Sequence, residues 1–206
     1  EREIAYLGRI SREKGIDILL KAFVALASRF PDWRLTLIGP WEIARGGDGD
    51  GYLAELKALT AGVEDRVRFV GPIYDGRDII SHLRKADIFV YPSIAEKGEA
   101  FGVAPVEAMA CGCAPILSAL KCFEDFVQSE ENGLVFDHRR DADTNLASAL
   151  ERLMQDAALR ERLGLAAIVA TRAGAGVDEG ASVLRIAGCS LRVDRRRGLH
   201  LARSFR

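Results

Sequence analysis

The sequence predicts an α/β fold built on a doubly wound parallel sheet of about six strands. Short runs rich in β-branched and apolar residues alternate along the chain with longer stretches in which apolar residues recur every three or four positions. With 206 residues, 49% of them hydrophobic, the chain is long enough to bury one such core. Right-handed crossovers then favour the strand order 3-2-1-4-5-6.

The individual elements are predicted from these two periods. The strand-like runs are Ile4–Arg9, Trp33–Ile38, Val67–Val70, Ile88–Tyr91, Ala114–Ser118 and Leu134–Phe136. The clearest helix has one apolar stripe, formed by Ile16, Leu19, Leu20, Phe23, Leu26, Ala27 and Phe30. Further helices are predicted at Tyr52–Ala61, Gly76–Lys85 and Val103–Cys111, and over residues 146–154.

The character of the chain changes at about Thr171, so we divide it into a domain of residues 1–170 and a tail of residues 171–206. The tail has eight arginines, three acids, no lysine and no sustained period. We expect an irregular basic tail, disordered or read from a shifted frame, in preference to a basic arm for an anionic partner. Because the chain begins at Glu1 and enters a strand at once, we expect it to be a piece of a longer protein.

Composition gives no support for a nucleic-acid partner or a membrane span. The net charge is −1, and charged residues interrupt every long apolar stretch. We therefore expect no nucleic-acid binding, no transmembrane segment, and a cytoplasmic location that is at most peripheral to the inner face of a membrane.

We expect no metal site. The four cysteines and three histidines lack the spacing of metal ligands, and thiols in a reducing cytosol are the preferred interpretation of Cys111, Cys113, Cys122 and Cys189. The run GGDGDG at Gly46–Gly51 is similar to a calcium loop, but Tyr52 stands at the next ligand position, which favours a flexible turn.

The predicted strand order places a ligand crevice between two loops. Strands 1 and 4 lie side by side, so the loops that follow them, Gly8–Gly15 and Pro92–Val103, leave from the same edge of the sheet. Arg9 and Lys14 in the first loop are two cations that suit a pyrophosphate.

The second loop reads EAFGVAPVEAMACG and carries two glutamates around a predicted helix start. The backbone amides of Phe101, Gly102 and Val103 begin the helix and would attract an anion. Glu107 shares a helix face with Val103 and could accept hydrogen bonds from a vicinal diol such as a ribose. Glu99 could do the same for sugar hydroxyls. The alternatives are an acid that complements the helix dipole for Glu107 and an ordinary loop acid for Glu99.

The segments GRISREKG and EAFGVAPVEAMACGCAPILS resemble the donor-binding half of the family 4 retaining glycosyltransferases, which have the GT-B fold. The shared pattern is G-R-x4-K-G after the first strand, then two glutamates separated by seven residues. The resemblance covers roughly Glu1 to Val169, with VRFVGPI and NGLVFD in family-like order. It implies a Rossmann-like domain that forms the C-terminal half of a GT-B enzyme.

The resemblance also implies roles for the loop residues. Arg9 and Lys14 would contact the donor diphosphate, and Glu107 the ribose. Glu99, with the backbone of Phe101–Val103, would hold the donor sugar. The catalytic candidates are Glu99, Arg9 and Lys14, with no metal or other cofactor; the two cations and the helix amides would stabilise the leaving diphosphate.

The function that we expect is therefore transfer of a sugar from a UDP, GDP or ADP sugar to an acceptor, with retention of configuration. The acceptor, a sugar, lipid or small molecule, would bind an N-terminal domain absent from this chain, so we expect the isolated chain to be inactive. A nucleotide-sugar epimerase, a phosphorylase of the same fold, and a non-catalytic nucleotide-sugar-binding fragment remain as alternatives. The absence of G-x-G-x-x-G after the first strand argues against a nicotinamide dehydrogenase.

Overall fold

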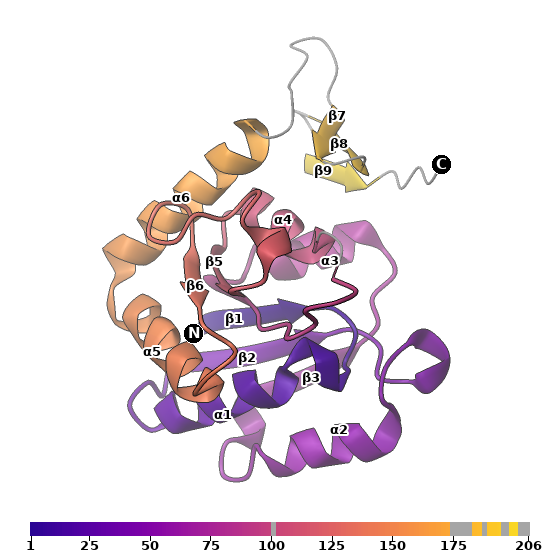
Figure 1. The fold of residues 1–206 in the computed structure, drawn as a ribbon, viewed down its shortest axis with the longest axis vertical. Coiled ribbons are helices and arrows are strands. Elements are labelled where there is room, and N and C mark those ends of the chain that lie inside the picture. The colour runs from indigo at the N-terminus through magenta and orange to yellow at the C-terminus, as the bar shows by residue number, and fades with distance from the viewer. Residues whose placement is uncertain (100–101, 174–182, 187–188, 195–197, 202–206) are drawn as a thin grey trace.

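The computed structural model describes residues 1–99, 102–173, 183–186, 189–194 and 198–201 (Figure 1). Its centre is a parallel six-stranded sheet in the order β3-β2-β1-β4-β5-β6, which confirms the predicted order. The strands are β1 Arg2–Leu7, β2 Trp33–Ile38, β3 Val67–Gly71, β4 Ile88–Tyr91, β5 Ala114–Ser118 and β6 Leu134–Phe136.

Helices connect the strands and cover both faces of the sheet (Figure 1). They are α1 Ile16–Ala27, α2 Gly49–Ala58, α3 Gly76–Leu83, α4 Val103–Ala110, α5 Ala142–Gln155 and α6 Ala157–Ala173. Helix α1 ends three residues before Phe30, the last member of the predicted stripe. Helix α2 begins at Gly49, so the second half of the GGDGDG run is helical rather than a flexible turn. Helix α6 was not predicted from the sequence, where the last predicted helix ends at residue 154.

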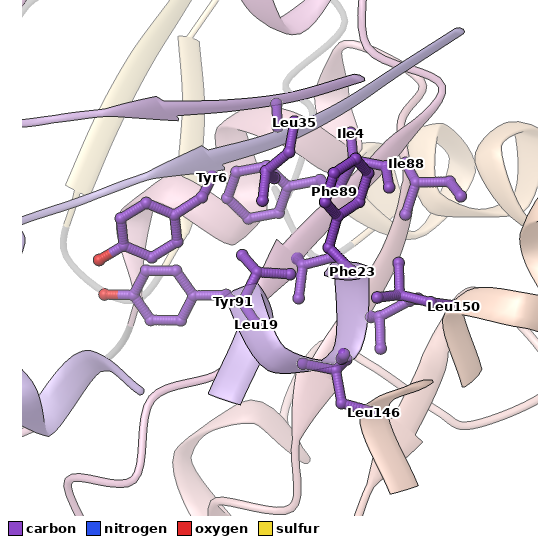
Figure 2. Close-up of a cluster of buried hydrophobic side chains, with 14 of the residues drawn as sticks. Ile4, Tyr6, Leu19, Phe23, Leu35, Ile88, Phe89, Tyr91, Leu146 and Leu150 are labelled. Carbon is purple, nitrogen blue, oxygen red and sulfur yellow. The ribbon is translucent and has the colours of Figure 1, made fainter. Parts of the chain in front are cut away.

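The core lies where the sheet meets α1 and α5. Figure 2 shows Phe23 of α1 beside the strand residues Ile4 and Phe89, with Leu146 of α5 at the other end of the same cluster. These four side chains are fully buried. A parallel strand with helices on both faces is buried on both sides, which is why β4 is a continuous apolar run without alternation, as is β1 from Ile4 onward.

The pairing of β1 with β4 fixes where the ligand loops start. These strands pair in parallel, with Ile4 opposite Ile88, although they are far apart in the sequence. Their carboxyl ends therefore lie together, and the loops that follow leave from one edge of the sheet.

The tail contains three short strands, β7 Val183–Ile186, β8 Cys189–Asp194 and β9 Gly198–Leu201, which pair antiparallel. Helix α6 continues to Ala173, past the predicted boundary at residue 170. The tail expected to be irregular thus includes hydrogen-bonded segments, and its remaining residues lie outside those described. Within the described residues, no helix is long and apolar enough to cross a bilayer.

Candidate functional site

A cleft with a volume of about 740 Å³ lies at the carboxyl edge of the sheet. Its walls come from the ends of β1, β2, β3 and β4 and from the start of α4. The structure brings six predicted site residues into this cleft, namely Arg9, Lys14, Glu99, Gly102, Val103 and Glu107. The seventh, Phe101, lies outside the described residues.

The first loop is held close to the second by a glycine. Gly15 ends the 3-10 helix Arg12–Lys14 in the left-handed conformation, with φ of 63°. A Cβ atom on Gly15 would lie 2.3 Å from the carbonyl oxygen of Pro92, so only glycine allows this approach. The K-G pair in the sequence thus places Lys14 beside the end of β4.

Arg9 reaches across the first loop and is paired in this structure. Its guanidinium donates to Glu13 Oε1 at 2.6 Å and to the carbonyl oxygen of Gly46 at 3.0 Å. The backbone amide of Arg12 donates to Asp48 Oδ2 at 2.5 Å. The GGDGDG segment therefore supports the first loop by direct hydrogen bonds, which its interpretation as a flexible turn did not anticipate.

Lys14 and Glu99 form a buried ion pair. Lys14 Nζ lies 2.5 Å from Glu99 Oε2, and the two side chains are only 7% and 9% exposed. Ser93 Oγ donates to the same carboxylate oxygen at 2.9 Å, and Tyr91 Oη approaches Glu99 Oε1 at 3.5 Å. Glu99 is thus oriented by three side chains, unlike its neighbour Glu96, an exposed acid that pairs with Arg139.

Two stacked tyrosines form the floor beneath this pair. The rings of Tyr6 and Tyr91 are 5.8 Å apart and nearly parallel, and Figure 2 shows their hydroxyls pointing the same way. Tyr6 donates to the carbonyl oxygen of Arg9 at 2.7 Å. Burial, and after it the charge of Glu99, raise the pKa of Tyr91 well above its usual value. Tyr91 is therefore a neutral phenol that can donate a hydrogen bond.

The start of α4 brings the second predicted glutamate to the cleft. Gly102 precedes the helix with φ of 64°, and a Cβ atom there would lie 2.8 Å from the ring of Phe123. Glu107 is one turn into the helix and is 7% exposed. Val103 and Glu107 both line the cleft, as their shared helix face predicts.

The other half of the cleft is largely apolar, and the sequence did not indicate it. It is lined by the last residue of β2, by residues of the loops after β2 and β3, and by one residue of α3, namely Ile38, Pro40, Pro72, Ile73 and Ile79. At its rim, Arg45 donates to the hydroxyl of Tyr74 and stacks 5.5 Å from its ring centre. The cleft thus suits a ligand with an anionic part and a flat apolar part.

Ser93, Tyr91, Arg45 and Tyr74 are the functional candidates that sequence reasoning missed. Their one common signal is position, because each belongs to the end of a sheet strand or to the loop that follows it. Among the described residues, no group of three or more His, Cys, Asp or Glu side chains could hold a metal ion. The expectation of a metal-free site stays a prediction.

The model of the family "Glycosyl transferases group 1" matches residues 1–169. A phosphatidyl-myo-inositol mannosyltransferase from Mycolicibacterium smegmatis is 33% identical over 160 residues, which cover 77% of this chain and 38% of that protein. The chain therefore spans less than half the length of this curated relative.

Two solved structures resemble the fold. The C-terminal domain of the glycosyl transferase group 1 family protein LpcC from Francisella tularensis superimposes with a TM-score of 0.72 at 26% identity, covering 84% of this chain and 85% of that chain. Anabaena Alr3699/HepE in complex with UDP-glucose gives a TM-score of 0.69 at 25% identity, covering 82% and 44%. The family match spans more than half of the sequence, and the chain belongs to the glycosyl transferases group 1 family.

Proposed function

We propose that this chain is the part of a glycosyltransferase that binds a nucleotide-diphosphate sugar and presents it to an acceptor. The observation that carries the proposal is the cleft, where the loops after β1 and β4 bring Arg9, Lys14, Glu99 and Glu107 together beside an apolar half. A nucleotide sugar has the matching parts: an anionic diphosphate, hydroxyl-rich sugars and a flat base. The likeness to HepE, whose structure holds UDP-glucose, supports the same ligand class.

In this proposal the diphosphate binds Arg9 and Lys14 and displaces their present carboxylate partners. Arg9 is paired with Glu13, and Lys14 with Glu99. A phosphate carries more charge and more acceptor oxygens than a carboxylate, so it competes well for both side chains. Once Lys14 turns to the phosphate, Glu99 accepts hydrogen bonds from the donor sugar, and Glu107 accepts them from the ribose.

The reaction that we propose is glycosyl transfer with retention of the anomeric configuration. The bond between the anomeric carbon and the diphosphate oxygen breaks, the acceptor hydroxyl oxygen forms the new glycosidic bond, and the proton of that hydroxyl passes to the leaving diphosphate. Arg9 and Lys14 stabilise the charge that develops on the leaving diphosphate, because fixed cations in a partly buried site act strongly on such charge. No metal ion is part of the proposal.

Transfer requires a second lobe in this account. The relative from M. smegmatis has more than half of its length outside the matched part. We propose that an N-terminal lobe binds the acceptor, closes the cleft and is needed for turnover. Robust transfer of a hexose from a nucleotide sugar by the 206-residue chain would contradict this part of the proposal.

Equilibrium binding of UDP, GDP and ADP to the chain tests the donor site, with inorganic pyrophosphate measured in parallel. Glu107→Gln should lower the affinity for the nucleotide about 10- to 100-fold, which corresponds to the loss of hydrogen bonds to a charged group. Pyrophosphate, which has no ribose, should bind Glu107→Gln as it binds the wild type. Glu161→Gln, an exposed acid on α6, is the charge-matched control. Equal losses for nucleotide and pyrophosphate would refute the ribose role, and no binding of any nucleotide to the folded chain would refute the function.

A further inference from the structure

Ser93 is a fully buried hydroxyl at the end of β4, two residues beyond Tyr91. It is absent from the lining of the cleft, yet its Oγ donates to Glu99 Oε2 at 2.9 Å. A backbone acceptor, the carbonyl oxygen of Glu13, lies farther away at 3.4 Å. A hydroxyl has one proton to donate, and the nearer, charged carboxylate is the stronger acceptor.

The backbone of Ser93 is itself fixed to the next strand. Its carbonyl oxygen accepts a hydrogen bond from Ser118 Oγ at 2.5 Å, and Ser118 is the last, fully buried residue of β5. The amide of the following residue, Ile94, donates to the carbonyl oxygen of Glu13 at 2.9 Å. A chain of hydrogen bonds therefore runs from β5 through Ser93 to Glu99, and Ser93 is anchored to rigid elements on both sides.

Among the described residues, no backbone hydrogen bond anchors Glu99 in this way. It lies between β4 and α4, in a segment without regular structure, and follows Gly98, whose φ is 107°. Its orientation therefore depends on side-chain partners. Lys14 and Ser93 both contact Oε2, whereas among the described residues Oε1 has only the long 3.5 Å approach of Tyr91. Oε1 is thus the oxygen that is available to a ligand.

We propose that Ser93 is a positioning residue that holds Glu99 Oε2, so that Oε1 is aimed at a hydroxyl of the donor sugar. The inference rests on the proposed function, in which the diphosphate draws Lys14 away from Glu99. Ser93 then becomes the partner that keeps the carboxylate in place. Because Ser93 is neutral and buried, no phosphate competes for it.

The test separates the sugar from the nucleotide. Binding of UDP, UDP-glucose, GDP and GDP-mannose is measured for the wild type and for Ser93→Ala, with circular dichroism as the check on folding. We expect Ser93→Ala to bind the nucleotide sugar about three- to tenfold more weakly, the size of one hydrogen bond of about 1 kcal/mol, with the affinity for the matching free nucleotide unchanged. Thr60→Val is the control, since it removes a buried hydroxyl that donates to the backbone carbonyl of Lys57 and does not contact Glu99.

A double variant tests whether Ser93 acts through Glu99. In a Glu99→Gln background the Ser93→Ala substitution should have much less effect on the nucleotide sugar, because the carboxylate that it orients is gone. The inference is overturned if Ser93→Ala weakens free nucleotide and nucleotide sugar equally, leaves both unchanged, or acts fully in the Glu99→Gln background. If the wild type binds none of the four ligands and neither ADP nor ADP-glucose, the proposed function fails and the inference falls with it.

Discussion

Replacing Lys14 by methionine isolates the buried ion pair on which the cleft is built. Methionine keeps the length and apolar stem of lysine but leaves the Glu99 carboxylate, 9% exposed, without its cation. Removal of one partner from a buried pair costs about 3–5 kcal/mol. Because Ser93 and Tyr91 still donate to Glu99, we expect the lower end, about 3 kcal/mol.

Urea unfolding followed by circular dichroism measures this loss in the free energy of unfolding, and thermal unfolding measures the matching change in Tm. For a protein of this size, about 3 kcal/mol corresponds to a fall in Tm of about 6–12 °C. Lys21→Met is the matched control, because Lys21 pairs with Asp17 at 3.1 Å in an exposed geometry that contributes less than about 1 kcal/mol. The double variant Lys14→Met, Glu99→Gln should recover more than half of the loss. If Lys14→Met costs no more than Lys21→Met, the pair is not the buried contact described above.

Three further predictions concern other parts of the fold. Gly15→Ala should destabilise the chain by more than Gly62→Ala. Both glycines have positive φ, which costs alanine about 1–2 kcal/mol, but only at Gly15 would the new Cβ meet a backbone atom, the carbonyl oxygen of Pro92 at 2.3 Å. Equal losses of stability in urea would contradict this. Burial raises the pKa of Cys111 to about 11, so at pH 8 it should react with a disulfide reagent more than about tenfold more slowly than free cysteine, as followed by peptide mapping. Labelling at the rate of free cysteine would refute the burial. Hydrogen bonds from Arg152 lower the pKa of Glu130 in the folded chain. This exposed pair therefore stabilises the fold at pH values above the pKa that Glu130 has in the unfolded chain, and the stabilisation is lost as pH falls. Arg152→Gln should therefore be slightly less stable than the wild type at pH 7, and the two unfolding curves should converge below about pH 3; a constant difference would count against the pair.

The sheet could be predicted from the sequence because its central strands are largely buried on both faces. Four strands, β2, β4, β5 and β6, have the predicted bounds, and the strand order is the predicted one. Burial on both faces requires continuous apolar runs, and those runs are visible without a structure. Helix α6, which starts just after the extended residue Asp156, was not predicted, because its apolar residues do not form a single stripe.

Part of the site could also be predicted from the sequence. The two loops were found because strand order alone places them at one edge, and charged side chains and glycines mark them. The pairing of Arg9 with Glu13 and of Lys14 with Glu99 could not be read from the sequence, since it depends on side-chain directions at the ends of β1 and β4. The apolar half was missed because isoleucine and proline after a strand do not differ in sequence from ordinary loop packing.

Hydrogen–deuterium exchange of the chain with and without saturating UDP, GDP or ADP tests the central claim most directly. A ligand slows exchange at amides that it contacts or orders, so it locates the site as well as detecting it. The account predicts that one of the three nucleotides protects the loops over residues 8–15 and 92–107 together, with little change in α6. Protection confined to other segments, or none with any nucleotide on a folded chain, would contradict the claim that this cleft binds the donor.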